Sequence, residues 1–225
     1  MSASDQQEAG MVHVVDDDES LRLALMRLLR AVGYNVCGYS CAGDFLIKRP
    51  GEQCGCVLLD VKMPGPGGFE LHEALVHRGV NLPVIFMTGH GDIAMSVRAM
   101  KAGAVDFLPK PVEREALLAA VKTALSLSAA IREQQSKYHR WSARLESLTP
   151  REHEVMNRVV AGHLNKQIAA ELGASERTIK THRANVMAKM EVMSVAELVE
   201  VAHELRHATV RPGYLCSGAV NSAVM

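Results

Sequence analysis

The sequence lacks any run of about 18 apolar residues, the length that a membrane-spanning helix needs. Residues 1–10 are polar and acidic, unlike the basic and apolar pattern of a secretory signal peptide. We therefore expect a cytoplasmic protein that makes no use of a membrane.

The chain also lacks the basis for a disulfide framework. Its five cysteines are an odd number, and no secretory signal precedes them. Cys54 and Cys56 are separated by a single glycine, whereas structural zinc sites use paired cysteines with longer gaps. Metal or redox chemistry at this pair stays an alternative. We favour reduced thiols, with Cys56 leading into a buried strand.

A strong charge of one sign is missing as well, because 25 basic residues balance 25 acidic ones. Residues 1–122 carry 12 lysines and arginines against 15 acidic residues, and residues 149–225 carry 9 against 8. The change from an acidic first half to a slightly basic C-terminal part suits a cation-binding site followed by an anion-binding domain. The basic excess is too small to identify a DNA-binding domain by itself.

Short apolar runs alternate with amphipathic stretches in residues 11–122. We expect strands at 12–15, 34–37, 56–59, 83–87 and 105–108. Helices are expected between them and after the last one, at 20–32, 42–48, 69–78, 92–102 and from 113 onward. Continuous apolar strands that alternate with helices indicate a parallel sheet covered on both faces. The first domain is therefore predicted to be an α/β fold with a doubly wound, five-stranded parallel sheet.

Chemically distinctive side chains follow the ends of these strands: Asp16, Asp17, Asp60, Thr88 and Lys110. In parallel α/β sheets the functional site lies at the carboxyl ends of the strands, so we expect these side chains to converge. Each residue alone has an ordinary explanation, such as a helix cap or a surface lysine. Five suitable residues at matching strand ends are much harder to explain in that way.

The residue types at this edge indicate a reaction. Carboxylates packed together repel each other unless a cation is present, and their hard oxygens suit Mg²⁺. A carboxylate beside Mg²⁺ can attack a phosphoryl group, whose developing charge needs hydrogen-bond donors and a second cation. Thr88 offers a hydroxyl and Lys110 an ammonium group. The set is therefore complete for phosphorylation of an aspartate.

A heptad pattern of mainly apolar residues runs from Leu117 to Leu148, as in the seam of a coiled coil. Alanine and glutamine occupy several seam positions, so a coiled coil would be weak by itself. Two alternatives stay open: a solvated linker helix, or a helical connector that pairs in a dimer.

Residues 149–207 are expected to be helical throughout. Thr149, Pro150 and Glu152 form a capping box that opens a helix ending near Gly162. A short helix, a glycine turn and a second helix containing Lys180, His182 and Arg183 fit a helix-turn-helix. The alternative is a helical bundle with a charged face. The remaining helix boundaries are assigned to Asn165 and Ser175 as N-caps, Gly173 as a left-handed turn, and Ser194–Glu197 as a second capping box.

Four motifs resemble those of receiver domains: VVDDD at 14–18, LDVKMP at 59–64, TGHG at 88–91 and FLPKP at 107–111. The likeness extends to about Lys122 and implies a flavodoxin-like fold. It implies that Asp60 is the phospho-acceptor. The Mg²⁺ site that it implies consists of Asp17, Asp60, the Lys62 carbonyl and, through water, Asp16.

The same resemblance implies a switch pair, Thr88 and Phe107, where Phe107 replaces the commoner tyrosine but keeps the aromatic ring. Lys110 would hold the phosphoryl group, and the Lys110–Pro111 peptide bond would be cis.

Three further motifs resemble a LuxR-type effector domain: LTPRE at 148–152, NKQIA at 165–169 and TIKTH at 178–182. With the receiver motifs in front, residues 11–205 are similar to the NarL/FixJ family of two-component response regulators, and FixJ-like in detail. The resemblance implies base contacts by Lys180, Thr181 and Ala184. It implies phosphate contacts by Lys166, Arg177, Arg183 and Asn185.

The predicted organisation is a disordered N-terminus at 1–10, a receiver domain at 11–122, a helical linker at 123–147, an all-α helix-turn-helix domain at 148–206, and a disordered tail at 207–225. The resemblance implies these partners: a sensor histidine kinase, double-stranded promoter DNA, RNA polymerase and, after phosphorylation, a second copy of the chain. We expect a transcriptional activator and not an enzyme.

Three other functions are disfavoured. Aspartyl phosphatases usually carry a second Asp two residues after the nucleophile, where this chain has Lys62. A phosphorylation-independent regulator would not need both Thr88 and Lys110. A LuxR-type sensor of small molecules would carry a ligand-sensing domain in place of the phospho-acceptor motif.

Overall fold

The computed structural model describes residues 10–48, 54–89 and 93–208. The chain divides into two compact units, and the division falls inside one long helix, between Glu133 and Gln134. The predicted disordered segments 1–10 and 207–225 lie outside the described residues, except for Gly10 and residues 207–208. Disorder is wrong for these. Gly10 is buried against Cys54, and residues 207–208 continue the last helix, which the buried Leu205 anchors in its core.

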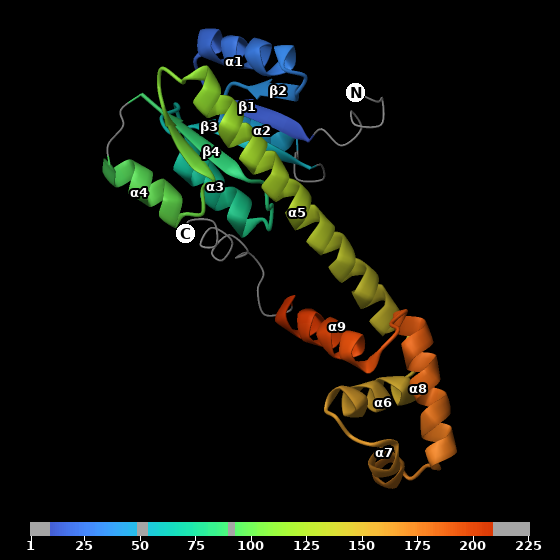
Figure 1. Ribbon diagram of the computed structural model, residues 1–225. Helices are drawn as coiled ribbons and strands as arrows, with labels where there is room; N and C mark the ends of the chain where they lie inside the picture. The colour runs from blue at the N-terminus through green and yellow to red at the C-terminus, as the bar shows by residue number, and fades with distance from the viewer. Residues whose placement is uncertain (1–9, 49–53, 90–92, 209–225) are drawn as a thin grey trace, which may run out of the picture. The chain divides into compact units, whose positions relative to one another are not determined.

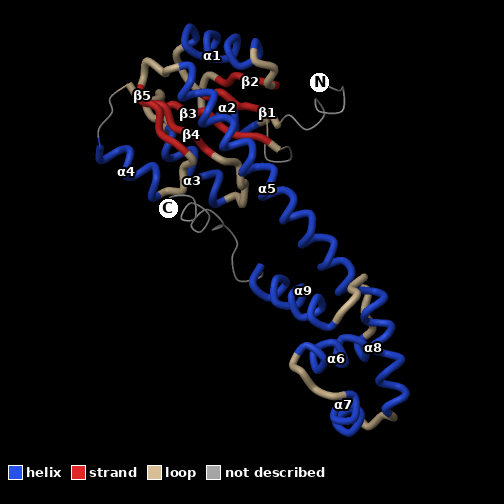
Figure 2. Tube along the Cα trace, in the orientation of Figure 1, coloured by secondary structure: helices blue, strands red, loops and turns tan. Residues whose placement is uncertain are grey.

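The N-terminal unit contains a parallel five-stranded sheet in the order β2-β1-β3-β4-β5, and it lies within the described residues (Figure 2). This is the flavodoxin-like strand order, so the predicted fold is confirmed. The strands are β1 (Met11–Val15), β2 (Asn35–Tyr39), β3 (Gly55–Asp60), β4 (Val84–Thr88) and β5 (Asp106–Pro109). The helices are α1 (Glu19–Ala31), α2 (Ala42–Ile47), α3 (Gly68–His77), α4 (Ile93–Lys101) and α5 (Arg114–Glu146).

Helices cover both faces of this sheet (Figure 1). On one face, apolar side chains of α1 and α5 pack against Val12 and Val14. On the other, side chains of α2, α3 and α4 pack against Val15 and Val57. Neighbouring residues of a strand point to opposite faces, so a strand that is covered twice is apolar throughout. Every residue of β3 is buried, as its continuous apolar run predicts.

Helix α5 continues well beyond the sheet, so the predicted linker at 123–147 extends the last helix of the N-terminal unit. The seam residues near its start pack in the core of that unit: Leu117, Ala120 and Ala124. Those near its end pack against the core of the C-terminal unit: Tyr138, Trp141, Leu145 and Leu148. The middle of the seam, comprising Leu127, Ile131 and Gln134, is outside both cores. Pairing of two linkers stays a prediction for this short stretch.

The C-terminal unit consists of helices around a small apolar core, as expected: α6 (Pro150–Val160), α7 (Asn165–Leu172), α8 (Glu176–Met190) and α9 (Val195–Ala208). The capping box at Thr149 and the Ser175 cap are confirmed. Gly173 adopts φ 61°, the predicted left-handed turn. Within the described residues, no helix has the length and apolarity that a membrane crossing requires.

One predicted cap is wrong, and one predicted capping box differs in one of its two bonds. Asn165 is the first residue of α7 rather than its cap, because its side chain is engaged elsewhere and the Leu164 N–H donates instead to Gln167 Oε1 at 2.8 Å. At α9 the predicted Ser194 cap is confirmed, since its Oγ accepts from the Glu197 N–H at 3.1 Å. The reciprocal bond differs, because the Glu197 side chain accepts from the Met193 N–H rather than from that of Ser194.

An ion pair with a buried carboxylate connects α6 and α8 in the C-terminal unit. Lys189 Nζ lies 2.6 Å from Glu152 Oε2, and the Glu152 side chain is only 5% exposed. The hydrogen bond from Lys189 is the largest cause that lowers the pKa of Glu152 to about 2, followed by the bond from the Thr149 backbone N–H. Glu152 is therefore charged and fully paired at neutral pH.

Candidate functional site

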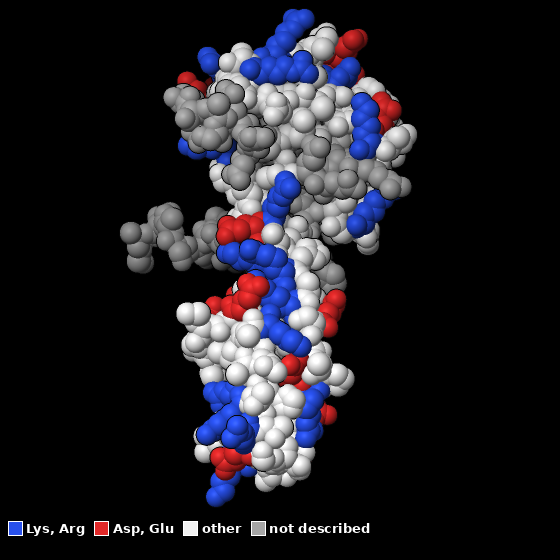
Figure 3. Space-filling model, turned by 90° about the vertical axis from the view of Figure 1, so that its right-hand side faces the viewer, with Lys and Arg blue, Asp and Glu red and all other residues white. Residues whose placement is uncertain are grey.

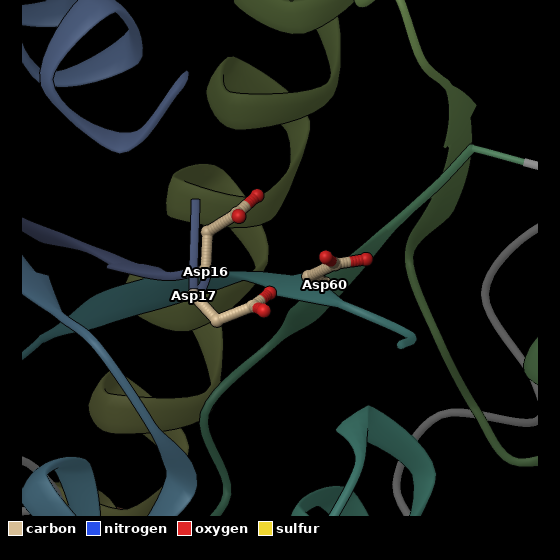
Figure 4. A group of neighbouring side chains, drawn as sticks. All are labelled: Asp16, Asp17 and Asp60. Carbon is tan, nitrogen blue, oxygen red and sulfur yellow. The ribbon is translucent and has the colours of Figure 1, made fainter. Parts of the chain in front are cut away.

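The predicted site residues meet at one edge of the sheet. Asp60 and Thr88 end β3 and β4, Asp16 and Asp17 follow β1, and Lys110 follows β5. One carboxylate oxygen from each of Asp16, Asp17 and Asp60 lies within 4.8 Å of the other two. Figure 4 shows these three side chains leaving the ends of the two neighbouring strands β1 and β3. The convergence predicted from the sequence is confirmed.

Lys110 joins two of the carboxylates. Its Nζ lies 2.8 Å from Asp16 Oδ2 and 2.7 Å from Asp60 Oδ2. Burial acts to lower the pKa of Lys110, but the hydrogen bonds and charges of Asp16 and Asp60 together outweigh it and raise that pKa. The lysine is therefore a firmly charged ammonium group. One ammonium faces three carboxylates, which leaves the site with excess negative charge.

Asp16 and Asp17 differ in what they offer to a cation. Asp16 is fully buried, and both of its oxygens are engaged, Oδ1 by the Asp18 N–H at 3.0 Å and Oδ2 by Lys110. Burial, the largest cause, raises the pKa of Asp16. Asp17 is exposed, so its carboxylate faces solvent beside Asp60. The excess negative charge and the hard oxygen donors fit Mg²⁺, which binds through few protein ligands and several waters.

Helices α7 and α8 of the C-terminal unit form the second candidate site. They are joined by the turn at Gly173 and pack through Ile168 and Ile179 in the core. The exposed side of α8 carries Lys180, Thr181 and Ala184. This is a helix-turn-helix arrangement, in which the second helix presents side chains that can enter a DNA groove.

The charge of this surface is mixed. Figure 3 shows one face of the C-terminal unit, on which lysine and arginine side chains gather with acidic side chains between them. The predicted phosphate-contacting residues Lys166, Arg177 and Asn185 are exposed. A surface of this kind provides cations for a phosphate backbone without a strongly basic total.

Two family models match the chain. The response regulator receiver domain matches residues 12–122, and the LuxR family of bacterial regulatory proteins matches residues 146–202. The response regulator protein TmoT of Ectopseudomonas mendocina is 43% identical over 199 residues, which cover 88% of this chain and 90% of TmoT. The transcriptional regulatory protein FixJ of Azorhizobium caulinodans is 44% identical over 191 residues, which cover 85% of this chain and 90% of FixJ. The chain belongs to the NarL/FixJ family of response regulators.

A solved structure supports the same assignment. The response regulator StyR is 47% identical and matches with a TM-score of 0.78, over 86% of this chain and 98% of that chain. The protein is therefore a transcriptional response regulator of a two-component system. Its N-terminal unit is the receiver domain, which takes its signal from a histidine kinase, and its C-terminal unit is the LuxR-type DNA-binding domain.

The remaining predicted residues of the receiver are Thr88, Phe107 and Lys62. Thr88 is 1% exposed at the end of β4. Phe107 on β5 is half-buried and packs against the core beneath α4. Lys62 is exposed, and its N–H donates to Asp60 Oδ1 at 3.2 Å. The predicted cis peptide bond between Lys110 and Pro111 is confirmed.

Arg183 of the LuxR-type domain differs from the other predicted DNA-contacting residues. Its side chain is half-buried, and its Nη1 donates to Asn165 Oδ1 at 3.1 Å. The bond ties the middle of α8 to the first residue of α7. Arg183 therefore braces the helix-turn-helix in this structure, a role that the sequence did not indicate.

Two residues at the acidic site were missed by the sequence interpretation. Arg22 of α1 reaches the backbone carbonyls of the aspartate turn. Gly68 begins α3 directly behind Asp60, and a Cβ atom there would lie 2.4 Å from the Asp60 carbonyl oxygen. An arginine in an amphipathic helix is ordinarily a solvated residue, and a glycine after prolines is ordinarily part of a loop. Neither carried a recognisable signal.

Proposed function

We propose that Asp60 accepts a phosphoryl group from a cognate sensor histidine kinase and thereby controls DNA binding by the LuxR-type domain. The observation that carries this proposal is the position of Lys110 Nζ, 2.7 Å from Asp60 Oδ2 and within a half-buried site. A fixed ammonium group at that place can stabilise the negative oxygens of a phosphoryl group bound to Asp60.

Asp17, Asp60 and the Lys62 carbonyl would hold Mg²⁺, with Asp16 contacting it through water. The bound ion would supply positive charge to the phosphoryl oxygens. The support for this set is the excess of carboxylates over the single ammonium of Lys110, and the exposure of Asp17. Asp16 is bonded through both oxygens, which suits an indirect contact.

In the transfer step, an Asp60 oxygen forms a bond to phosphorus while the bond from phosphorus to the kinase histidine nitrogen breaks. The electron pair of that bond leaves with the imidazole. Lys110 then pairs with the phosphoryl group, and the Thr88 hydroxyl donates to one of its oxygens. The phosphorylated residue carries a charge near −2 in place of the single negative charge of the carboxylate.

The charge would change the conformation of the receiver. As Thr88 moves toward the phosphoryl group, Phe107 turns into the space that Thr88 leaves. This remodels the surface of α4 and β5, where Val97 is 46% and Met100 is 54% exposed. We propose that two receivers pair there. A shift from 1% to 99% active would need about 5.5 kcal/mol of differential stabilisation.

The dimer would then bind promoter DNA in the cytoplasm, where the bacterial chromosome lies. Lys180, Thr181 and Ala184 would contact bases in the major groove, and Asn185 would contact phosphate. Lys166, Arg177 and Arg183 are the other proposed phosphate contacts, and Arg183 would have to leave Asn165 to make one. We propose that the bound dimer recruits RNA polymerase and activates transcription.

Genomic DNA capture tests the proposal. The purified chain is incubated with Mg²⁺ and sheared genomic DNA, with or without beryllofluoride as a phosphoryl mimic, and the captured fragments are sequenced. We expect a short inverted repeat enriched only with the mimic, and no such gain for Asp60→Asn. Equal enrichment with and without the mimic would retain DNA binding but remove phosphorylation from its control. Enrichment in neither sample would contradict the proposed output.

A further inference from the structure

We propose that Arg22 is a positioning residue for the metal-binding carboxylates, and that it acts by holding the backbone of the turn that carries Asp16 and Asp17. The inference rests on the proposed Mg²⁺ site. It assigns to this receiver a second cationic residue beside the carboxylates, with a task different from that of Lys110.

The geometry is specific. Arg22 lies in the first turns of α1, and its side chain is half-buried. Its Nη1 donates to the Asp16 carbonyl oxygen at 2.6 Å and lies 3.5 Å from that of Asp17. The 2.6 Å contact is a short, charge-assisted hydrogen bond, and the longer one is weak. The guanidinium therefore holds the backbone at the point where the two aspartates leave β1.

Hydrogen bonds of Asp18 hold the same turn where it leads into α1. The Asp18 N–H donates to Asp16 Oδ1 at 3.0 Å, and the Asp18 side chain accepts from the N–H groups of Ser20 and Leu21 as the N-cap of α1. Asp17 lies between these anchors and has an exposed side chain. Since the conformation of its backbone decides where its carboxylate points, the Arg22 bond controls the direction of a proposed metal ligand.

Arg22 and Lys110 place their charges differently. Lys110 binds carboxylate oxygens directly, so it occupies lone pairs that a cation could use. Arg22 binds carbonyl oxygens and leaves the carboxylates free. Its positive charge still offsets part of the repulsion among the aspartates.

The positioning role and a purely electrostatic role predict opposite changes in metal affinity. If Arg22 were only a nearby charge, its removal would strengthen Mg²⁺ binding, because a cation repels a cation. If it holds the turn, its removal weakens binding, as loss of residues that orient metal ligands typically does by about 10-fold or more.

The test uses the full chain and titrates it with Mg²⁺ in a calorimeter. We expect Arg22→Met to bind Mg²⁺ about 10-fold more weakly than the wild type. Arg22→Lys, which keeps a donor and the charge, should recover part of that loss. Arg27→Met is the matched control, because Arg27 is exposed on the same helix and its loss removes the same charge. It should bind Mg²⁺ like the wild type.

A kinetic measurement separates positioning from damage to the site. Phosphorylation by acetyl phosphate is followed over a range of Mg²⁺ concentrations. For Arg22→Met we expect the half-saturating Mg²⁺ concentration to rise about 10-fold while the rate at saturation matches the wild type. Unchanged or tighter Mg²⁺ binding by Arg22→Met would overturn the inference and leave the proposed function intact. Absence of Mg²⁺ binding by the wild type would instead overturn the proposed metal site, and the inference with it.

Discussion

Each domain of this protein buries a carboxylate against a lysine, but the two pairings differ in their charge balance. In the LuxR-type domain, one ammonium, Lys189, meets one carboxylate, Glu152, and the pKa of Glu152 falls to about 2. In the receiver, Lys110 faces Asp16 and Asp60 with Asp17 close by, and burial raises the pKa of Asp16.

The balanced pair serves the structure, because it joins two helices and completes a capping box. The unbalanced cluster is unfavourable without a further cation or a reaction that uses it, since unpaired buried charge is costly. The number of carboxylates that share one lysine therefore separates a structural ion pair from a functional site within one chain.

The largest expected effect is the loss of phosphoryl uptake. Asp60→Asn removes the proposed nucleophile, so incubation with radiolabelled acetyl phosphate and Mg²⁺ should leave no label on the protein. Glu152→Gln, which changes the buried acid of the other domain, should be labelled as the wild type is. Label retained on Asp60→Asn would show that another residue is the acceptor.

Acidification should destabilise the receiver before the LuxR-type domain. Burial lowers the pKa of His13 from 6.5 to about 4, so the unfolded chain takes up this proton first and stability falls as pH drops from 6.5 to 4. The loss amounts to about 3 kcal/mol. Glu152 contributes stability that is present above its usual pKa of 4.5 and is lost as pH falls through about 2.

Amide hydrogen exchange of the sheet, followed from pH 7 to pH 4.5, measures the loss of stability of the receiver. The raised pKa of Asp16 acts in the opposite sense, because the folded receiver takes up that proton first. The variant His13→Asn isolates the contribution of the histidine to this loss of stability. This variant should lose less stability than the wild type over the same range, and equal losses would contradict the assignment.

Glu152→Gln should destabilise the LuxR-type domain by about 2 kcal/mol, because Lys189 loses its partner and the capping box loses its charge. Trp141 is the only tryptophan in the sequence, and it packs against the core of this domain. Urea unfolding followed by its fluorescence therefore reports on this domain. Glu154→Gln, at an exposed position of the same helix, is the control and should change stability by less than about 0.5 kcal/mol.

Without Mg²⁺, Asp17→Asn should have the smallest effect on the free energy of unfolding, and it should stabilise rather than destabilise the domain. Without Mg²⁺, loss of one exposed charge from the cluster should stabilise the receiver by about 1 kcal/mol. Saturating Mg²⁺, at about 100 times its dissociation constant, should stabilise the wild type by about 2.7 kcal/mol and this variant much less. Calorimetry with and without the ion measures both. Destabilisation of the metal-free variant would contradict the unbalanced-charge interpretation.

The acidic site could be predicted from the sequence because its members follow strands whose apolar pattern is clear. Once Asp16, Asp60 and Lys110 are placed at the ends of parallel strands, the fold brings them together. Arg22 could not be found in this way, since its contact runs from a side chain to a backbone carbonyl. Helix patterns specify which face is apolar but not which oxygen a long polar side chain reaches.

The linker and the DNA-binding surface also have contacts that the sequence pattern could not predict. The heptad period predicted that α5 is long, but it could not tell whether Leu117 and Trp141 face a partner helix or the cores of their own domains. The family resemblance implies a phosphate contact for Arg183, whereas in the structure Arg183 donates to Asn165. The local periodicity of the sequence predicts where helices and strands form. Contacts between side chains of different helices or strands depend on the assembled fold.

The glycine behind the acidic site has a consequence for how such regulators diversify. Any side chain at Gly68 would collide with the Asp60 carbonyl, so this position is closed to substitution. Ala184 and Thr181 project from an exposed helix face, where replacements change stability by only about 0.5 kcal/mol. After gene duplication, a copy can therefore acquire new target promoters through single changes on α8, while the chemistry that receives the signal is inherited intact.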